Sequence, residues 1–197
     1  MSDWNNLEST WQQVMSGALE AYIEGSIPIG AVVADEHGVI VSRGRNKFTQ
    51  DRIAHAETEA LRTVPITLNR NNAMLFSSME PCPMCIGAIR LMRLRAIKFA
   101  ARDPAAGSIE LLRATQFMRH VECQVFEPDD LLLERVNVAM MMEYRTRNGH
   151  QRWRESWFSY LPEAVEVGET LAASTFFEES RQSTPQKIYD TIAAKFC

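Results

Sequence analysis

The sequence contains few cysteines and no long apolar run. Four of its 197 residues are cysteines, while 46% are hydrophobic and 23% are charged. No stretch approaches the roughly 18–20 consecutive apolar residues of a membrane-spanning helix. The first residues also lack the basic start and apolar core of a signal peptide. We therefore expect a soluble, cytoplasmic protein that does not contact a membrane.

Basic charge is scarce as well. Twenty-one lysines and arginines against 25 acidic residues give a formal net charge of -4. Proteins that bind nucleic acids indiscriminately usually carry a broad basic surface, so the composition disfavours this class, although a local basic patch remains compatible with it. A chain of this length buries about 70% of its unfolded surface, which allows a core without disulfide bonds.

Hydrophobic periodicity changes repeatedly along the chain between the helical and the strand pattern. The expected helices cover residues 7–22, 54–63, 82–93, 108–118 and 129–145, and the expected strands cover residues 29–34, 39–43, 73–77, 96–100 and 121–126. This order predicts an α/β protein: a three-layer α/β/α sandwich around a central mixed five-stranded sheet.

Residues 151–197 differ in composition from the rest of the chain. They contain five basic and seven acidic side chains, together with the aromatic residues Trp153, Trp157, Phe158, Phe176 and Phe177. Such a density of aromatic residues argues against disorder. We therefore divide the chain into a domain over residues 1–150 and a C-terminal extension over residues 151–197. We expect the extension to be helical and packed on the core or on a partner subunit.

Two of the cysteines, Cys82 and Cys85, stand three residues apart. In a reducing compartment this spacing indicates a metal site or a redox pair rather than a structural disulfide. Pro81 and Pro83 mark a junction between a strand and a helix, which places both sulfurs near a helix N-terminus, where the thiolate form is favoured. At positions i and i+3 the two sulfurs can hold one ion.

His55 can supply a third ligand from the start of the preceding helix, and Glu57 follows two residues later. Three protein ligands with water in the fourth position are typical of catalytic zinc, and a nearby carboxylate can take and return the proton of that water. Two alternatives remain open for the cysteine pair. A C-x-x-C motif also occurs in structural zinc half-sites, and C-P-M-C is similar to the motif of glutaredoxin-like redox proteins.

The segments HAETEALR and MEPCPMCIGAIR together resemble the cytidine-deaminase superfamily, whose zinc-dependent members carry H-x-E…P-C-x-x-C. The resemblance extends from about residue 4 to residue 147, through PIGAVV, SRGRN and ARDPAAGSIELL. It is strongest for the tRNA adenosine deaminases and the small purine nucleobase or nucleoside deaminases. The roles that it implies are zinc ligation by His55, Cys82 and Cys85, proton transfer by Glu57, and contacts with the substrate by Asn46 and the backbone of Ala56.

The resemblance leaves two substrates in competition. ARDPAAGSIELL and the arginines after Glu143 favour a tRNA-specific adenosine deaminase that acts at the wobble position. SSMEPCPMC, SIPIGA and IRLMRL depart from the pattern of that family, and the net charge is acidic. We therefore favour hydrolytic deamination of a free nucleobase or nucleoside. A deaminase-fold binding subunit without activity is a further hypothesis, against which the intact Glu57 argues.

Two further features bear on partners. The helix over residues 82–93 is apolar on more than one face, and the resemblance implies that it forms a homodimer interface. A further cluster is typical of a solvated helix end with packing aromatics, or else of RNA contacts; it consists of Arg145, Arg147, Arg152, Arg154, Trp153 and Trp157. His150 fits no ligand spacing, so we assign it no role.

Overall fold

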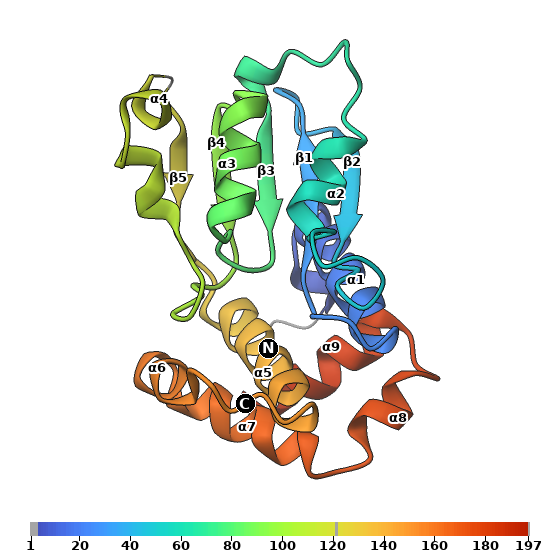
Figure 1. Ribbon diagram of the computed structural model, residues 1–197. Helices are drawn as coiled ribbons and strands as arrows, with labels where there is room; N and C mark the ends of the chain where they lie inside the picture. Colours follow the sequence, from blue (N-terminus) through green and yellow to red (C-terminus); the bar gives the residue numbers. More distant parts are fainter. Residues whose placement is uncertain (1–3, 121, 197) are drawn as a thin grey trace.

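The computed structural model describes residues 4–120 and 122–196 (Figure 1). Its helices and strands are α1 (Ser9–Ile23), β1 (Gly30–Ala34), β2 (Ile40–Arg45), α2 (Ala56–Arg62), β3 (Met74–Ser77), α3 (Pro83–Met92), β4 (Ala96–Phe99), α4 (Gln116–Arg119), β5 (Gln124–Phe126), α5 (Leu131–Arg147), α6 (Arg154–Tyr160), α7 (Pro162–Ala172), α8 (Phe176–Ser180) and α9 (Pro185–Ala193). Prolines at the first position of α3, α7 and α9 suit helix starts, where the missing N–H costs nothing. No helix in the described part of the chain is both long and apolar enough to cross a membrane.

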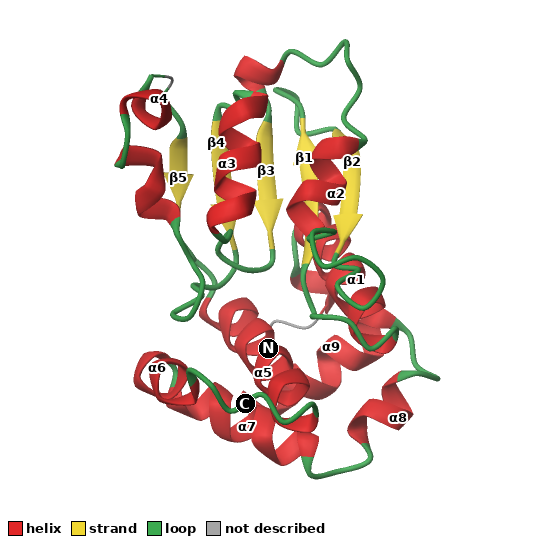
Figure 2. Ribbon diagram, viewed as in Figure 1, coloured by secondary structure: helices red, strands yellow, loops and turns green. Residues whose placement is uncertain are grey.

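The five strands form one mixed sheet, as the sequence predicts, and their order in it is β2-β1-β3-β4-β5 (Figure 2). β1 pairs in antiparallel fashion with β2 and with β3, whereas β3, β4 and β5 are parallel. β2 and β3 therefore run in the same direction and end at the same edge of the sheet. The helices that follow them, α2 and α3, consequently begin at that edge.

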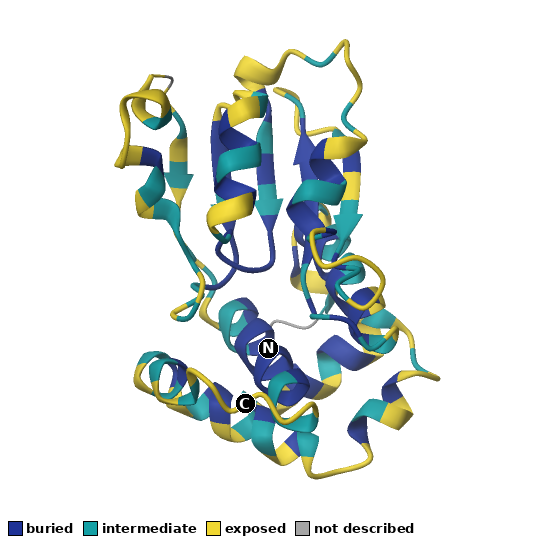
Figure 3. Cartoon of the chain, in the orientation of Figure 1, coloured by how far each residue is buried: buried dark blue, intermediate teal, exposed yellow. Residues whose placement is uncertain are grey.

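Helices cover both faces of the sheet, which confirms the predicted α/β class. Ala31 and Val33 of β1 pack in one apolar cluster with Ile86 of α3. Val32, on the opposite face of the same strand, packs in a second cluster with Trp11 of α1. All five residues of β1 are buried, and Figure 3 shows this strand in the interior of the sheet. The core therefore lies on both sides of β1.

Two predicted elements are shorter than expected. The helix expected over residues 108–118 is divided into a 3-10 turn, Ile109–Arg113, and the short α4. Thr115 separates them because its hydroxyl accepts a hydrogen bond from Met118 N at 3.2 Å and so starts a new helix. The strand expected over residues 121–126 forms only at Gln124–Phe126, where β4 offers three partners, and residue 121 lies outside the described residues.

The segment after α5 forms α6–α9, which Figure 1 shows grouped around α5 below the ends of the strands. α7 packs along α5 at the position of Gly168, where an added Cβ would lie 2.5 Å from the carbonyl oxygen of Ala139 and 2.7 Å from Cβ of Met142. The guanidinium of Arg147 in α5 lies 3.5 Å from the ring centre of Phe177 in α8. Close helix packing and this cation–π contact fix the segment on α5.

We expect Gly168→Ala to lower the free energy of unfolding by about 1–3 kcal/mol, because the added methyl group overpacks the contact between α5 and α7. The matched control is Gly87→Ala in α3, where a Cβ meets no atom within 4 Å. That change should raise the free energy of unfolding by about 0.5–1 kcal/mol, since alanine favours a helix interior over glycine. Urea denaturation of both variants measures the difference. Equal stabilities would contradict the close packing of α7.

Candidate functional site

The predicted metal ligands lie at the sheet edge where α2 and α3 begin. His55 is the residue immediately before α2, and Cys82 is the residue immediately before α3. Cys85 lies in the first turn of α3, on the side of Cys82. Because β2 and β3 end at one edge, residues far apart in the sequence are brought together there.

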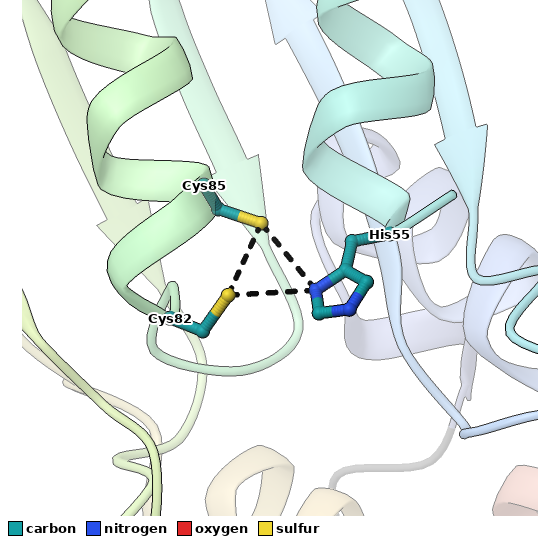
Figure 4. A group of neighbouring side chains, drawn as sticks. All are labelled: His55, Cys82 and Cys85. Atoms are coloured by element: carbon teal, nitrogen blue, oxygen red, sulfur yellow. Dashed lines mark hydrogen bonds between the residues drawn. The ribbon is translucent and has the colours of Figure 1, made fainter. Parts of the chain in front are cut away.

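The three side chains point at one another, as Figure 4 shows. Nδ1 of His55 lies 3.5 Å from Sγ of Cys82 and 3.6 Å from Sγ of Cys85, and the two sulfurs are 3.6 Å apart. A tetrahedral zinc ion, with bonds of about 2.3 Å to sulfur and about 2.0 Å to nitrogen, separates two sulfurs by about 3.8 Å and a sulfur from a nitrogen by about 3.5 Å. The observed spacing fits zinc bound by two thiolates and one imidazole.

The two thiols have opposite pKa shifts. The hydrogen bond between the sulfurs is the largest cause: it lowers the pKa of Cys82 to about 4 and raises that of Cys85. The hydrogen bond with Cys82 also raises the pKa of His55. These shifts favour the thiolate form of Cys82 and the protonated forms of Cys85 and His55. A metal ion replaces these protons when it binds, which makes metal affinity depend on pH.

Glu57 lies beside the cluster and is only 2% exposed. Its Oε1 accepts a hydrogen bond from Ser77 Oγ at 3.1 Å, and its Oε2 lies 3.3 Å from Sγ of Cys85. Burial raises the pKa of this carboxyl group. A carboxyl group whose pKa is raised and which sits next to a metal site is suited to accept a proton and return it.

The two predicted substrate contacts are both fully buried. Asn46 follows β2, and its Oδ1 accepts hydrogen bonds from Ser26 Oγ at 2.8 Å and from Phe48 N at 2.9 Å. Its Nδ2 has no hydrogen-bond partner among the described residues. An unpaired buried N–H is costly, which indicates that a ligand or water accepts from it. Ala56 is the first residue of α2, and its predicted contact with the substrate stays a prediction.

A cavity of about 530 Å³ adjoins these groups. Its lining includes His55 and Cys82 of the cluster, the neighbouring Glu57, and Asn46, which follows β2. Its volume falls within the roughly 300–1,000 Å³ that is usual for small-molecule sites. His55 and Cys82 of the cluster, the buried carboxyl group of Glu57 and the amide of Asn46 therefore border the same cavity.

Comparison with known proteins relates this geometry to a family. Residues 5–101 match the cytidine and deoxycytidylate deaminase zinc-binding region. The tRNA-specific adenosine deaminase of Bacillus subtilis is 36% identical over 121 residues, which cover 56% of this chain and 74% of that protein. The chain belongs to the cytidine and deoxycytidylate deaminase family. The zinc cofactor of this family agrees with the His55, Cys82 and Cys85 cluster.

Other known proteins match over different shares of their length. The guanine deaminase of Bacillus subtilis is 40% identical over 84 residues, which cover 40% of this chain and 53% of that protein. A solved structure of a tRNA:A34 deaminase aligns with a TM-score of 0.54 and 26% identity over 60% of this chain and 91% of that chain. A tRNA(Ile)-lysidine synthase of Deinococcus radiodurans is 35% identical over 108 residues, which cover 52% of this chain but only 19% of that protein.

Part of the cavity of this deaminase-family chain comes from residues to which the sequence patterns assign no role in the site. Asp103 lines it from the loop after β4, and its Oδ1 accepts hydrogen bonds from the backbone N–H groups of residues 105 and 106. Arg145, residues 149–153 and Trp157 line it from the C-terminal side. Trp153 precedes α6 and Trp157 lies within it, and no local signal in the sequence shows that either residue meets the cavity.

We expect the purified protein to contain one zinc ion per chain and Cys85→Ala to lose most of it. Loss of one of three protein ligands leaves too few donors for a stable site. The matched control is Cys123→Ala, which removes a partly buried thiol outside the cluster. Elemental analysis after dialysis against a mild chelator measures the metal. Full zinc content in Cys85→Ala, or its loss in Cys123→Ala, would contradict the assigned ligand set.

Proposed function

We propose that this chain is a zinc-dependent hydrolytic deaminase that converts the exocyclic amine of a free nucleobase or nucleoside to a carbonyl group and releases ammonia. His55, Cys82 and Cys85 would hold the metal. Membership of the deaminase family supports the reaction class. The observation that supports a small substrate is the cavity of about 530 Å³, whose lining combines the cluster with residues 149–153 and Trp157 of the C-terminal segment.

The proposed chemistry assigns proton transfer to Glu57. When bound, zinc supplies a water that is activated for attack near neutral pH. Glu57 would take one proton from this water and give it to a ring nitrogen next to the reacting carbon. It would then take the second proton, from the hydroxyl group now bonded to that carbon, and pass it to the amine, which leaves as ammonia while the carbonyl group forms. Ser77 Oγ orients the carboxyl group of Glu57 by donating to its Oε1, and this group lines the cavity beside the cluster, so it needs no large movement to act there.

Asn46 is proposed to orient the substrate. Two hydrogen bonds to its Oδ1 fix the amide so that its unpaired Nδ2 can donate to an acceptor on the base or sugar. This arrangement is the reason to prefer a substrate contact over the alternative of a plain turn residue. The contact with Ala56 is proposed from family resemblance.

Action on transfer RNA is the second candidate. It is favoured by the similarity to tRNA-specific adenosine deaminases and by the arginines Arg145 and Arg152 at the cavity. In such an enzyme these arginines would contact phosphates, and the affinity would fall steeply with salt concentration.

A homodimer through α3 also remains a proposal. Ile86, Ile89 and Leu94 are buried against the sheet within one chain, so much of the apolar character of this helix serves the core. Leu91, in contrast, is 69% exposed and available to a partner.

The predicted domain boundary at residue 150 falls inside the stretch 149–153, which lines the cavity, so we propose that both parts of the chain act in one site.

We expect Glu57→Gln to retain zinc and to lower kcat/KM by about 10²–10⁴-fold, because the amide cannot carry the proton. The matched control is Glu59→Gln on the same helix, where the carboxylate pairs with Lys47 and Arg62 instead of facing the cavity. Ammonia release by the zinc-loaded protein is measured against nucleobases, nucleosides and an unmodified tRNA.

Each result of this assay has a defined meaning. Release from a free base or nucleoside that Glu57→Gln abolishes supports the proposed function. Release from tRNA alone would replace it with the second candidate. If protein that still binds zinc releases no ammonia from any of these substrates, the proposed enzymatic activity is wrong and a deaminase-fold binding subunit is favoured.

A further inference from the structure

Part of the cavity wall lies beyond the region that defines the family. The family match ends at residue 101, whereas residues 149–153, which join α5 to α6, line the cavity. α6 adds Trp157, which is 1% exposed. Residues 149–153 and Trp157, which line the cavity beside the cluster, therefore come from a part of the chain outside the family match.

The connection over residues 149–153 is held in place at both ends. His150 N donates to the carbonyl oxygen of Arg145 at 2.7 Å, and the Arg145 guanidinium donates to the carbonyl oxygen of Arg152. On the other side, Arg154 donates to both carboxylate oxygens of Glu169 in α7, at 2.5 and 2.9 Å. These contacts fix the position of residues 149–153, which form one wall of the cavity.

Trp153 stands out within this wall. Its φ of 71° places it in the left-handed region, where a bulky side chain is an outlier. Strained residues of this kind persist where the surroundings hold them, and they gather at functional sites. The side chain lines the cavity and is nevertheless 48% exposed, so it lies between the cavity and solvent. The guanidinium of Arg152 lies 5.0 Å from the centre of its ring.

We propose that Trp153 is a specificity-determining residue that admits a free base or nucleoside to the cavity and keeps out a base that is still part of a folded RNA. A base in RNA brings two flanking sugars and phosphates, which must stay outside the entrance while the base enters. Trp153 and Arg152 both line the cavity and are both exposed to solvent, so we place them at that entrance. The proposal rests on the proposed function, because it concerns the substrate of the same site.

The test uses Trp153→Gly, which removes the ring while relieving the left-handed conformation. Arg93→Gly is the matched control, because Arg93 also has a positive φ, of 56°, at the end of α3, and it does not line the cavity. Both glycine variants should fold and bind zinc as the wild type does. Hairpin RNAs with an unpaired adenine, cytosine or guanine in the loop are compared with the free base or nucleoside that the enzyme accepts.

We expect Trp153→Gly to bind a fluorescent hairpin at least about tenfold more tightly than the wild type, and its preference in kcat/KM for the free substrate over the hairpin to fall by about tenfold or more. Arg93→Gly should match the wild type in both. Unchanged hairpin affinity in Trp153→Gly would overturn the proposal. Weaker affinity would overturn it as well, and would make Trp153 a stacking platform for RNA. Hairpin binding is measured without turnover, so it tests the role of Trp153 even in an inactive protein. A lack of activity on small substrates would therefore contradict the proposed function and leave the binding test unaffected.

Discussion

The site depends on the position of β1 between β2 and β3. Because both neighbours are antiparallel to β1, they are parallel to each other and end at the same edge of the sheet. β1 is buried on both faces, so its register is fixed by the two apolar clusters that pack against it. His55 and Cys82, which start the helices after β2 and β3, therefore meet although 27 residues separate them.

The same edge also determines the electrostatics of the reaction. Cys82 and Cys85 lie at the N-terminus of α3, where helix dipole and free N–H groups favour thiolate. Glu57 lies one residue inside α2 and is buried, which by itself disfavours its charged form. Ser77, the last residue of β3, offsets part of this cost by donating to Oε1. One strand arrangement thus places both the predicted metal ligands and the buried carboxyl group of Glu57.

Local patterns predict the chemistry of this chain better than they predict its cavity. His55, Glu57, Cys82 and Cys85 could be found because each lies in or next to the first turn of a helix, where spacing alone fixes the facing direction. The interruption at Thr115 is a single side-chain cap, which helical periodicity does not reveal. The wall over residues 149–153 depends on contacts between residues far apart in the sequence. Arg154 with Glu169 is one of these, and Gly168 against α5 is another.

The predicted metal ligands and part of the cavity lining therefore come from separate parts of the chain. The metal ligands and Glu57 fall within residues 55–85, inside the family region, whereas the cavity lining continues to Trp157. The left-handed conformation of Trp153 costs about 1–3 kcal/mol and must be held by its surroundings, here the anchored α6 and α7. α7 is in turn positioned by its close approach to α5 at Gly168. If Trp153 selects the substrate as proposed, changes in helix packing far from the cluster can alter that selection while His55, Cys82 and Cys85 stay the same.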